Sequence, residues 1–417
     1  MPEFLTLLPP DEARALLLGQ LSQPITDSEV VGVPASLGRV LAEDIVAPHP
    51  LPDFQRSTVD GYAVRARDTH GASDSLPAYL QLIGEVPMGD SPAFEISAGQ
   101  CALIHTGGML PNGTDSVVML EYIQKTGSDE IEIFRAVAEG ENLIHVGEDV
   151  AQGQTVLRKG SLIRPAEIGG LMALGIVKVN VVRHVRVGVI STGDEVIDPS
   201  QTPRPGQVRD VNSHALAALI EKSGGTAELY GIIPDTFESL QDAAGKALSE
   251  CDMLIITAGS SASTRDITAD VIRSLGEPGV LVHGINTRPG KPTILGVCNE
   301  KAVIGLPGNP VSALVNGYLF VVPAIEKLLG ALPRTKPHVL ARLTVNLPSQ
   351  AGREDWWPVR LISPSPLGKG QDEPMHAEPI FGKSNLIFTL ASADGLLRIH
   401  PDATGLSAGE MVEVYLV

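Results

Sequence analysis

The segment VRVGVISTGDE, residues 185–195, begins the part of the chain that decides the fold. Its apolar first half is typical of a buried strand, and a short polar loop follows. Beyond it, strand-like and helix-like segments alternate in the order SHALAALIEKSGG, TAELYGII, FESLQDAAGKALSE, DMLIIT, DITADVIRSL, KAVIGL and VSALVNGYLFVVPAIEKLL. Such alternation requires right-handed crossovers and gives a mostly parallel sheet with helices on both faces. We therefore predict a doubly wound α/β domain over residues 183–329.

The sequence on either side of this domain follows other patterns. Short, turn-bounded β-like pieces such as YLQLIGEV, CALIHTG and SVVMLE fill residues 49–144 and predict an inserted β-rich domain. Helical spacing in DEARALLLGQLS, and in LIRPAEIGGLMALG with its early proline, places residues 1–48 and 145–182 in one discontinuous N-terminal domain. A proline-rich linker then leads to residues 337–417, whose short strands and turns predict a β-barrel-like domain. The fold class is thus α/β, with several domains.

Composition and charge exclude several classes of protein. The 31 basic and 49 acidic residues give a formal net charge of −18, so binding to nucleic acid or to a membrane is not expected. Cys101, Cys251 and Cys298 lie far apart and predict free cytosolic thiols. The N-terminus does not resemble a signal peptide, and the apolar stretch Ile168–Val182 is too short to span a bilayer. We expect a soluble cytoplasmic protein that binds any anion through a local basic cluster.

Acidic residues follow neighbouring strands of the predicted α/β sheet. Ligands of such sheets bind outside the carboxyl ends of the strands. The loops leaving these ends are STGDE (191–195), PDT (234–236), AGSSASTRD (258–266) and PGNP (307–310). One acid at a strand end is more often a helix cap. Glu195, Asp235 and Asp266 at neighbouring ends nevertheless favour one Mg²⁺ site, because Mg²⁺ takes a few carboxylates together with phosphate oxygens.

Two further loops carry groups suited to anions. The N–H groups of AGSSASTRD can face an anion at a helix N-terminus, and the hydroxyls of Ser261 and Ser263 can donate as well. The alternative is that the hydroxyls only shape a turn and that Asp266 caps the helix over ITADVIRSL. TRPGKP, residues 287–292, supplies Arg288 and Lys291 or, alternatively, forms a solvated basic turn.

Two polar stretches of the β-rich domain are further candidates. FQRSTVDGYAVRAR, residues 54–67, is densely polar around Asp60, with arginines on both sides. IHTGGMLPNGTDSVVMLE, residues 104–121, carries Thr106 in a glycine-rich turn, which is also an ordinary turn signature.

Taken together, several motifs resemble one family over essentially the whole chain. They are STVDGYAV, IHTGGMLPNGTDSVV, VGEDVAQG, STGDEV, GQVRDVNS, RPGKP and GLPGNPVSA. This series resembles the molybdopterin molybdenumtransferases, which include bacterial MoeA and the E domain of gephyrin. The resemblance implies insertion of molybdenum from molybdate into adenylylated molybdopterin, with Mg²⁺-dependent release of AMP. It also implies an elongated homodimer whose cleft joins the α/β domain of one subunit to the β-rich domain of the other.

The resemblance also implies roles for individual residues. It gives catalytic roles to Asp60, Thr106, Glu195, Asp235 and Asp266, and we expect the last three to be the Mg²⁺ ligands. It gives substrate-binding roles to Arg288, Lys291, Pro307, Pro310, Arg353 and Ser384. One departure stands out: where the family has SGGVSxGxxD, this chain has AGSSASTRD, which keeps the aspartate but loses two glycines. If either glycine needed a positive φ, the backbone path of this loop differs.

Two alternatives stay open at this point. One is a nucleotidyltransferase that adenylylates the pterin, because such enzymes share a similar α/β domain. If the chain is instead a molybdenumtransferase, that adenylylating enzyme is a candidate partner. The other is a non-catalytic anion-binding or scaffold protein, motivated by the altered loop. Molybdate and tungstate have nearly the same size and charge, so no single residue distinguishes them.

Overall fold

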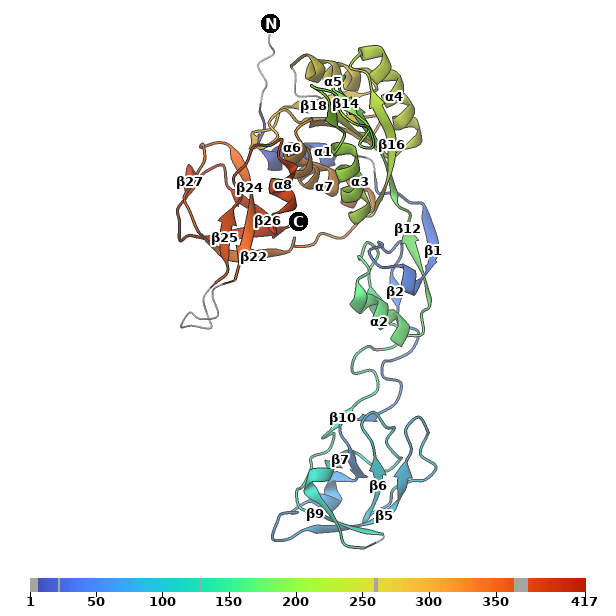
Figure 1. Ribbon diagram of the computed structural model, residues 1–417. Helices are drawn as coiled ribbons and strands as arrows, with labels where there is room; N and C mark the ends of the chain where they lie inside the picture. The colour runs from blue at the N-terminus through green and yellow to red at the C-terminus, as the bar shows by residue number, and fades with distance from the viewer. Residues whose placement is uncertain (1–6, 22, 128, 259–261, 364–373) are drawn as a thin grey trace.

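The computed structural model describes residues 7–21, 23–127, 129–258, 262–363 and 374–417, without the side chains of 262–266. The molecule is elongated (Figure 1): a β-rich body lies at one end, and the α/β body lies beside a small β-barrel at the other. The predicted multidomain α/β fold class is confirmed by the sheets of these bodies.

The central sheet has six strands in the order β16–β13–β17–β21–β20–β18. Their bounds are β13 (Val185–Thr192), β16 (Gly225–Ile233), β17 (Met253–Ala258), β18 (Pro278–His283), β20 (Ile294–Cys298) and β21 (Lys301–Pro307). The first four strands of this order are parallel, whereas β20 runs antiparallel to both of its neighbours. Strands β13, β17 and β21 are almost entirely buried, because helices cover both faces of the sheet.

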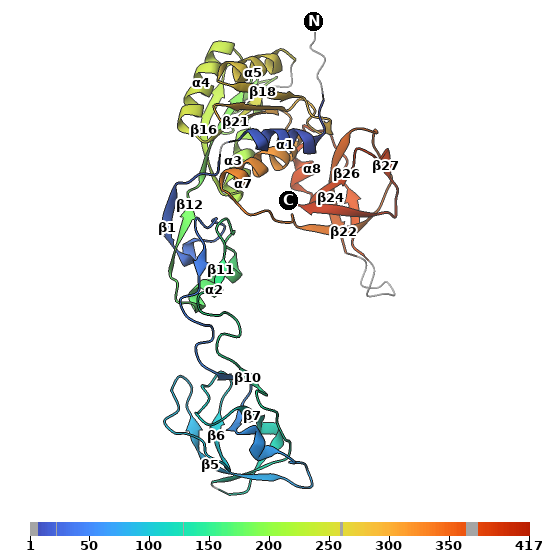
Figure 2. The same ribbon diagram turned by 180° about the vertical axis from the view of Figure 1, so that it is seen from behind.

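The helices form one layer on each face. One layer holds α1 (Pro10–Gln20), α3 (Asn212–Lys222) and a long helix of residues 310–328, and the other holds α4 (Phe237–Glu250) and α5 (Ala262–Ser274). The view from behind shows α1 next to α7 of the long helix (Figure 2). Each layer closes its own apolar core: Leu17 and Phe320 are fully buried in one, and Leu240 and Val271 in the other. This division gives the sheet its nearly continuous apolar strands.

The long helix is continuous but not uniform. It consists of α6 (Pro310–Asn316), a π-helical turn (Gly317–Val321) and α7 (Val322–Leu328). Among the described helices it alone is long and apolar enough to cross a membrane. In this structure, 72% of its most apolar window is buried within the protein. Its apolar composition therefore matches its position over the sheet.

Three features of this body differ from the prediction. The hairpin β18–β20 was not predicted, because its two short strands are separated by the basic TRPGKP segment and show no long periodicity. Helix α5 begins at Ala262, since small and hydroxyl residues without proline or glycine can continue a helix. Asp266 therefore lies inside the helix, and the alternative that it is the N-cap is wrong. Helix α1 packs on the α/β core, although the prediction grouped residues 1–48 with residues 145–182.

A narrow connection leads from the α/β body to the β-rich body (Figure 1). The chain crosses it twice, in opposite directions, so that outgoing and returning segments pair. These pairs are β1 (Ser28–Gly32) with β12 (Lys178–Val182), β2 (Ile45–Val46) with β11 (Thr155–Leu157), and β3 (Arg56–Ser57) with β10 (Leu143–Ile144). Helix α2 (Pro165–Ala173) packs beside them around Leu41, Ile163 and Val181. The connection thus has a small apolar core of its own.

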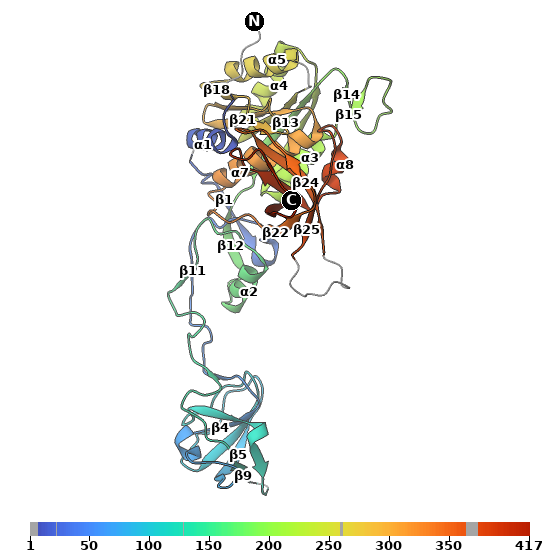
Figure 3. The ribbon, with the colours of Figure 1, turned by 90° about the vertical axis from the view of Figure 1, so that its left-hand side faces the viewer.

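The β-rich body contains a second six-stranded sheet, in the order β7–β4–β6–β5–β9–β8. The strands are β4 (Gly61–Val64), β5 (Ala78–Val86), β6 (Gln100–Ile104), β7 (Ser116–Met119), β8 (Ile123–Lys125) and β9 (Glu130–Ile133). Tyr62, Ile131 and Ile133 are buried in its core. Figure 3 shows this body at the opposite end of the molecule from the central sheet, and it also shows the parallel pair of β14 (Val196–Ile197) and β15 (Val208–Arg209) projecting from the α/β body.

The C-terminal strands close into a barrel, as predicted. The closed series is β24–β25–β22–β28–β26 and back to β24. The strands are β22 (His338–Leu343), β24 (Glu354–Ile362), β25 (His376–Pro379), β26 (Gly395–Ile399) and β28 (Met411–Leu416), with β23 (Leu347–Pro348) and β27 (Gly405–Leu406) forming a separate pair. Strand β19 (Thr287–Arg288) comes from the α/β body and pairs in parallel with β24. The barrel is therefore joined to the α/β body beside the TRPGKP segment.

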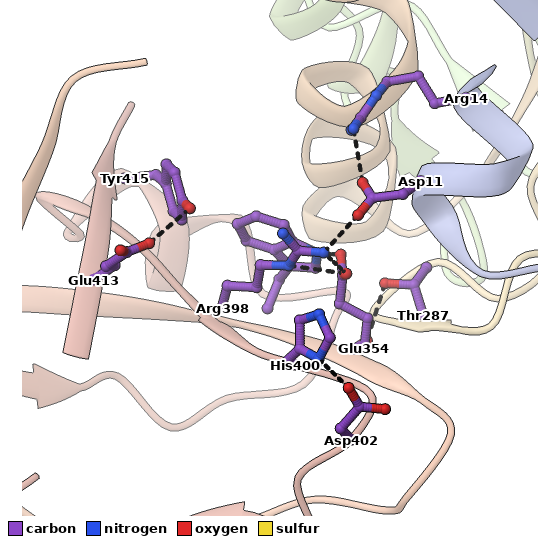
Figure 4. Close-up of polar contacts among 10 residues, drawn as sticks. Asp11, Arg14, Thr287, Glu354, Arg398, His400, Asp402, Glu413 and Tyr415 are labelled. Carbon is purple, nitrogen blue, oxygen red and sulfur yellow. Dashed lines mark hydrogen bonds and ion pairs between the residues drawn. The ribbon is translucent and has the colours of Figure 1, made fainter. Parts of the chain in front are cut away.

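Buried charges reinforce this junction (Figure 4). Arg398 of the barrel donates to Asp11 of helix α1 at 2.9 Å and to the carboxylate of Glu354 at 2.5–2.9 Å. Glu354 is almost fully buried, and its backbone carbonyl accepts the hydroxyl hydrogen of Thr287 at 3.1 Å. The ion pair of Arg398 with the buried Glu354 lies within the barrel and keeps that carboxylate paired, whereas the bonds of Arg398 to Asp11 and of Thr287 to Glu354 join the barrel to the α/β body.

Candidate functional site

Polar side chains meet where the parallel strands of the central sheet end. The Ser191 hydroxyl donates to Asp210 at 2.7 Å and lies 3.2 Å from the Thr257 hydroxyl. The Thr192 hydroxyl donates to Asp235, which places this predicted residue next to the end of β13. Asp210 also accepts the backbone N–H of Ser213 at 3.1 Å, which caps helix α3. The carboxyl ends of neighbouring strands thus share one polar network.

A cavity of about 670 Å³ opens over this network, and we call it the strand-end cavity. Glu195, Asp210 and Thr257 line it on one side, and Asn309 and Pro310 line it at the start of the long helix. The two predicted residues in its lining are Glu195 and Pro310. Glu195 is exposed, so its carboxylate is available to a ligand.

A second cavity, of about 710 Å³, lies between the α/β body and the barrel, and we call it the junction cavity. Five predicted substrate-binding residues line it: Arg288, Lys291, Pro307, Arg353 and Ser384. They come from β19 and the turn after it, the end of β21, the start of β24 and the segment before helix α8 (Ile387–Ala391). Asn309 and Asn385 line both cavities, so the two cavities are adjacent.

The junction cavity is basic although the chain as a whole is acidic. Arg288, Lys291, Arg353 and Lys383 line it, and its described lining contains no aspartate or glutamate. Carboxylates that would otherwise balance these cations are therefore kept away from the space a ligand would fill. Such a lining favours an anionic ligand.

Asp355, which is buried behind the lining, and Trp357, which is part of the lining, orient the two arginines. Arg353 donates to both carboxylate oxygens of Asp355, at 2.6 and 3.0 Å, and Asp355 is fully buried. The Arg288 guanidinium lies 4.0 Å from the same carboxylate and 5.2 Å from the centre of the Trp357 ring. A bidentate pair fixes the plane of a guanidinium, and an aromatic face favours a cation above it.

Three contributors were not predicted: Lys383, Asp355 and Trp357. Lys383 belongs to the GKS segment that was quoted for its serine, so the segment was recognised but not this side chain. Asp355 pairs with Arg353 only two residues before it in the chain, whereas Asp355 and Trp357 reach Arg288 only because β19 pairs with β24. Local sequence patterns could not reveal that contact.

Asp60 and Thr106 lie together in the β-rich body. Asp60 directly precedes β4 and Thr106 follows β6, and these strands pair. One Asp60 oxygen accepts the backbone N–H of Thr106 at 2.8 Å and its hydroxyl at 3.2 Å. These bonds hold the pKa of the exposed Asp60 carboxyl below its usual value, the backbone bond most strongly. The arrangement favours an ionised aspartate.

The structure divides the predicted residues into two groups within one chain. The sheet that carries Asp60 and Thr106 lies at the opposite end of the molecule from both cavities (Figures 1 and 3). Ser261 lies outside the described residues, and so do the side chains of Ser263 and Asp266. Their predicted roles stay predictions.

The described residues contain no group of three or more His, Cys, Asp or Glu side chains arranged to hold a metal ion. The predicted Mg²⁺ set includes Asp266, whose side chain is not among them. Glu195 lines the strand-end cavity together with Thr192, whose hydroxyl donates to Asp235; both carboxylates are hard oxygen donors, and Mg²⁺ needs only one or two of these beside phosphate oxygens. The two described members therefore fit the ion.

The cysteines are not suited to nucleophilic chemistry. All three are buried and free. Burial raises the pKa of the Cys101 thiol to about 12 and that of Cys298 to about 11, and it also raises the pKa of Cys251. They therefore remain protonated at neutral pH, and a thiolate ligand is not available from this chain.

Comparison with known families extends over both groups of residues. Residues 8–175 match the "MoeA N-terminal region (domain I and II)", residues 188–327 the "Probable molybdopterin binding domain", and residues 340–417 the "MoeA C-terminal region (domain IV)". The chain belongs to the MoeA family.

Individual relatives support the same assignment along the full length. The molybdopterin molybdenumtransferase of Bacillus subtilis is 33% identical over 100% of this chain and 96% of its own. That of Haemophilus influenzae is 35% identical over 83% and 84%. The crystal structure of the molybdopterin biosynthesis MoeA protein from Pyrococcus horikoshii is 35% identical, covers 99% of this chain and 100% of its own, and superposes with a TM-score of 0.84.

These matches confirm the predicted family and, at the level of the family, a transferase of molybdenum cofactor biosynthesis. They do not favour the two alternatives. The regions on either side of the α/β domain are of the MoeA type, and several relatives are named as transferases.

Proposed function

We propose that this MoeA-family chain inserts molybdenum from molybdate into adenylylated molybdopterin and releases AMP. The observation that carries this proposal is the junction cavity, where four cations and no described acid face a recess in a chain of net charge −18. Molybdate is a small tetrahedral dianion, and guanidinium and ammonium groups suit its oxygens. The adjacent strand-end cavity offers room for the pterin and its phosphates.

The basic side chains bind and orient the oxyanion. Asp355 holds the plane of the Arg353 guanidinium, so binding costs little further loss of side-chain freedom. Arg288 is held over Trp357, while Lys291 and Lys383 add charge without a fixed plane. Ser384 adds a hydroxyl donor, and its backbone carbonyl accepts the Val311 N–H at 3.0 Å, which joins it to the long helix.

The carboxylates at the strand ends act on the phosphate groups of the substrate. Glu195, Asp235 and Asp266 would hold Mg²⁺ there. When bound, the ion neutralises phosphoanhydride oxygens and polarises phosphorus for the release of AMP. Thr192 orients Asp235 through its hydroxyl, and the hydroxyls of Ser261 and Ser263 would donate to phosphate oxygens. The dithiolene sulfurs of the pterin accept the molybdenum, since the buried protein thiols stay protonated.

The protein acts as a homodimer in this proposal. Asp60 and Thr106 of one subunit face the cavities of the other, which accounts for an ionised aspartate placed so far from the cavities of its own chain. The adenylylated substrate comes from a pterin-adenylylating enzyme, which is a candidate partner. We place the protein in the cytoplasm, where free thiols such as these three stay reduced.

The test is release of AMP from adenylylated molybdopterin by the purified protein, with and without molybdate and Mg²⁺. We expect release to require both ions. Replacing both Arg288 and Lys291 by methionine, which leaves the Arg353–Asp355 pair intact, should abolish the molybdate-dependent release of AMP and leave the circular dichroism spectrum unchanged. Release of AMP that is indifferent to molybdate would contradict the proposal.

A further inference from the structure

The turn that carries Arg288 and Lys291 is attached to the long helix by one buried amide. The side chain of Asn316 is fully buried. Its Nδ2 donates to the backbone oxygen of Pro289 at 3.2 Å and to that of Ser312 at 2.8 Å. Pro289 lies directly after Arg288, and Ser312 lines the junction cavity. The amide thus joins the turn to a helical residue of the cavity wall.

The turn approaches Asn316 as closely as its backbone allows. A Cβ atom added at Gly290 would lie 1.7 Å from Asn316 Nδ2, and the φ of this glycine is +105°. Only a glycine can occupy such a position without moving the amide or the turn. The contact between helix and turn is therefore direct, and it lies midway between the two basic residues.

The stability of the helix alone does not explain an asparagine here. Asn316 Oδ1 is buried and has no hydrogen-bond partner among the described residues, and an unpaired buried oxygen is unfavourable. The residue also stands directly before the π-helical turn Gly317–Val321, and π turns occur frequently at functional sites. An apolar side chain would satisfy the core better but could not hold Pro289.

We propose that Asn316 is a positioning residue, which fixes the TRPGKP turn so that Arg288 and Lys291 stand at the spacing an oxyanion requires. This inference rests on the proposed function, because it takes the junction cavity as the molybdate site. Asn316 itself does not line that cavity. Its effect reaches the ligand only through the turn.

The main test compares Asn316→Leu with the native protein. Calorimetric titration with sodium molybdate alone gives the Kd, thermal melting gives the Tm, and AMP release gives KM and kcat. We expect a Tm close to the native value, because the loss of the unpaired oxygen offsets the loss of the two hydrogen bonds that Nδ2 donates. We expect the Kd and the KM for molybdate to rise roughly 10-fold to 100-fold, as for other small displacements of binding groups, with kcat nearly unchanged.

Two further variants keep the test decisive. Asn316→Ala removes the amide without adding bulk beside Gly290, and it should weaken molybdate binding as much as the leucine variant does. Val315→Ala is the matched control, because Val315 is the preceding residue, is fully buried and belongs to the apolar core. It should lower the Tm and leave the Kd for molybdate unchanged.

The outcomes separate this inference from the proposed function. If the native protein binds molybdate and both Asn316 variants bind it with the same Kd, only the positioning role is overturned. Failure of both variants to fold would overturn it as well, since the amide would then serve stability. Absence of molybdate binding by the native protein would overturn both the inference and the proposed function.

Discussion

The orientation of Arg353 depends on a carboxylate that never meets the ligand. Asp355 is fully buried and holds the guanidinium in a fixed plane. Lysine cannot form a bidentate pair, so in Arg353→Lys the charge stays while the fixed plane is lost. We expect the Kd for molybdate to rise roughly 10-fold by calorimetry. Arg342→Lys changes an exposed barrel arginine outside the cavity and should leave the Kd unchanged. Equal binding by both variants would show that charge alone suffices.

The second prediction concerns how the ionisation of the Asp60 carboxyl affects the dependence of the rate on pH. Thr106 holds its pKa below the usual value, so Asp60 stays ionised as the pH falls through the ordinary range of an aspartate and is protonated only below it. Thr106→Val removes the hydroxyl bond but keeps the backbone bond, so the pKa should rise part of the way back. The acidic limb of the rate profile should shift to higher pH, and NMR titration of Asp60 should show the same shift. Thr114→Val changes a hydroxyl that is bonded to Pro111 and serves as the control. An unmoved pKa in Thr106→Val would contradict the assignment.

Among the elements, helix α1 shows how far packing can depart from chain order. Leu17 is fully buried in the α/β core, while Leu37 is 59% exposed. Leu17→Ala should lower the free energy of unfolding by about 2–5 kcal/mol, and Leu37→Ala should change it by less than about 0.5 kcal/mol. Hydrogen exchange should quicken in β20, which α1 contacts, only in the first variant. Unchanged protection there would mean that α1 does not stabilise the sheet.

Helix α5 contains Asp266, whose position inside the helix the sequence analysis did not predict. Because Asp266 lies inside the helix, its replacement by alanine removes the charge without removing an N-cap. Asp266→Ala should melt near the native temperature, lose most AMP release and recover part of it at higher Mg²⁺. Asp270→Ala, on the same helix and exposed, should behave as the native protein. Normal turnover of Asp266→Ala at ordinary Mg²⁺ would remove the residue from the proposed metal site.

The sequence predicted those features that depend on residues close together in the chain. Helix α4 was predicted with its observed bounds, because Thr236 caps it and its apolar residues repeat at helical spacing. The start of α5 and the hairpin β18–β20 lack such signals. In the site, motif residues such as Arg288 and Ser384 were recognised, whereas Asp355 and Trp357 were not. Asp355 is only two residues from Arg353, but its approach to Arg288, like that of Trp357, requires β24 to pair with β19, which joins segments far apart in the chain.

For the whole molecule, the division of the predicted residues into two groups can be tested by mixing inactive variants. Asp60→Asn alters the β-rich body, and Asp235→Asn alters the α/β body. In mixed dimers one of the two clefts would contain only native residues, so random exchange should restore roughly a quarter of the native activity. Arg288→Met mixed with Asp235→Asn alters the same body twice and should restore none. Equal results for the two mixtures would exclude a cleft shared between subunits.

Because the chain crosses the connection twice, the β-rich body moves as one piece when the connection bends. The outgoing and returning segments pair along the connection, so a bend at β1 and β12 turns both segments together. The sheet that carries Asp60 then moves through an arc. A residue near β1 and β12 travels little in such a bend, while one at the tip travels far. The stiffness of the β1–β12 ribbon therefore limits how accurately Asp60 can be brought to a substrate. Substitutions in a ribbon that touches no ligand would then act on the reaction as strongly as substitutions in the cleft.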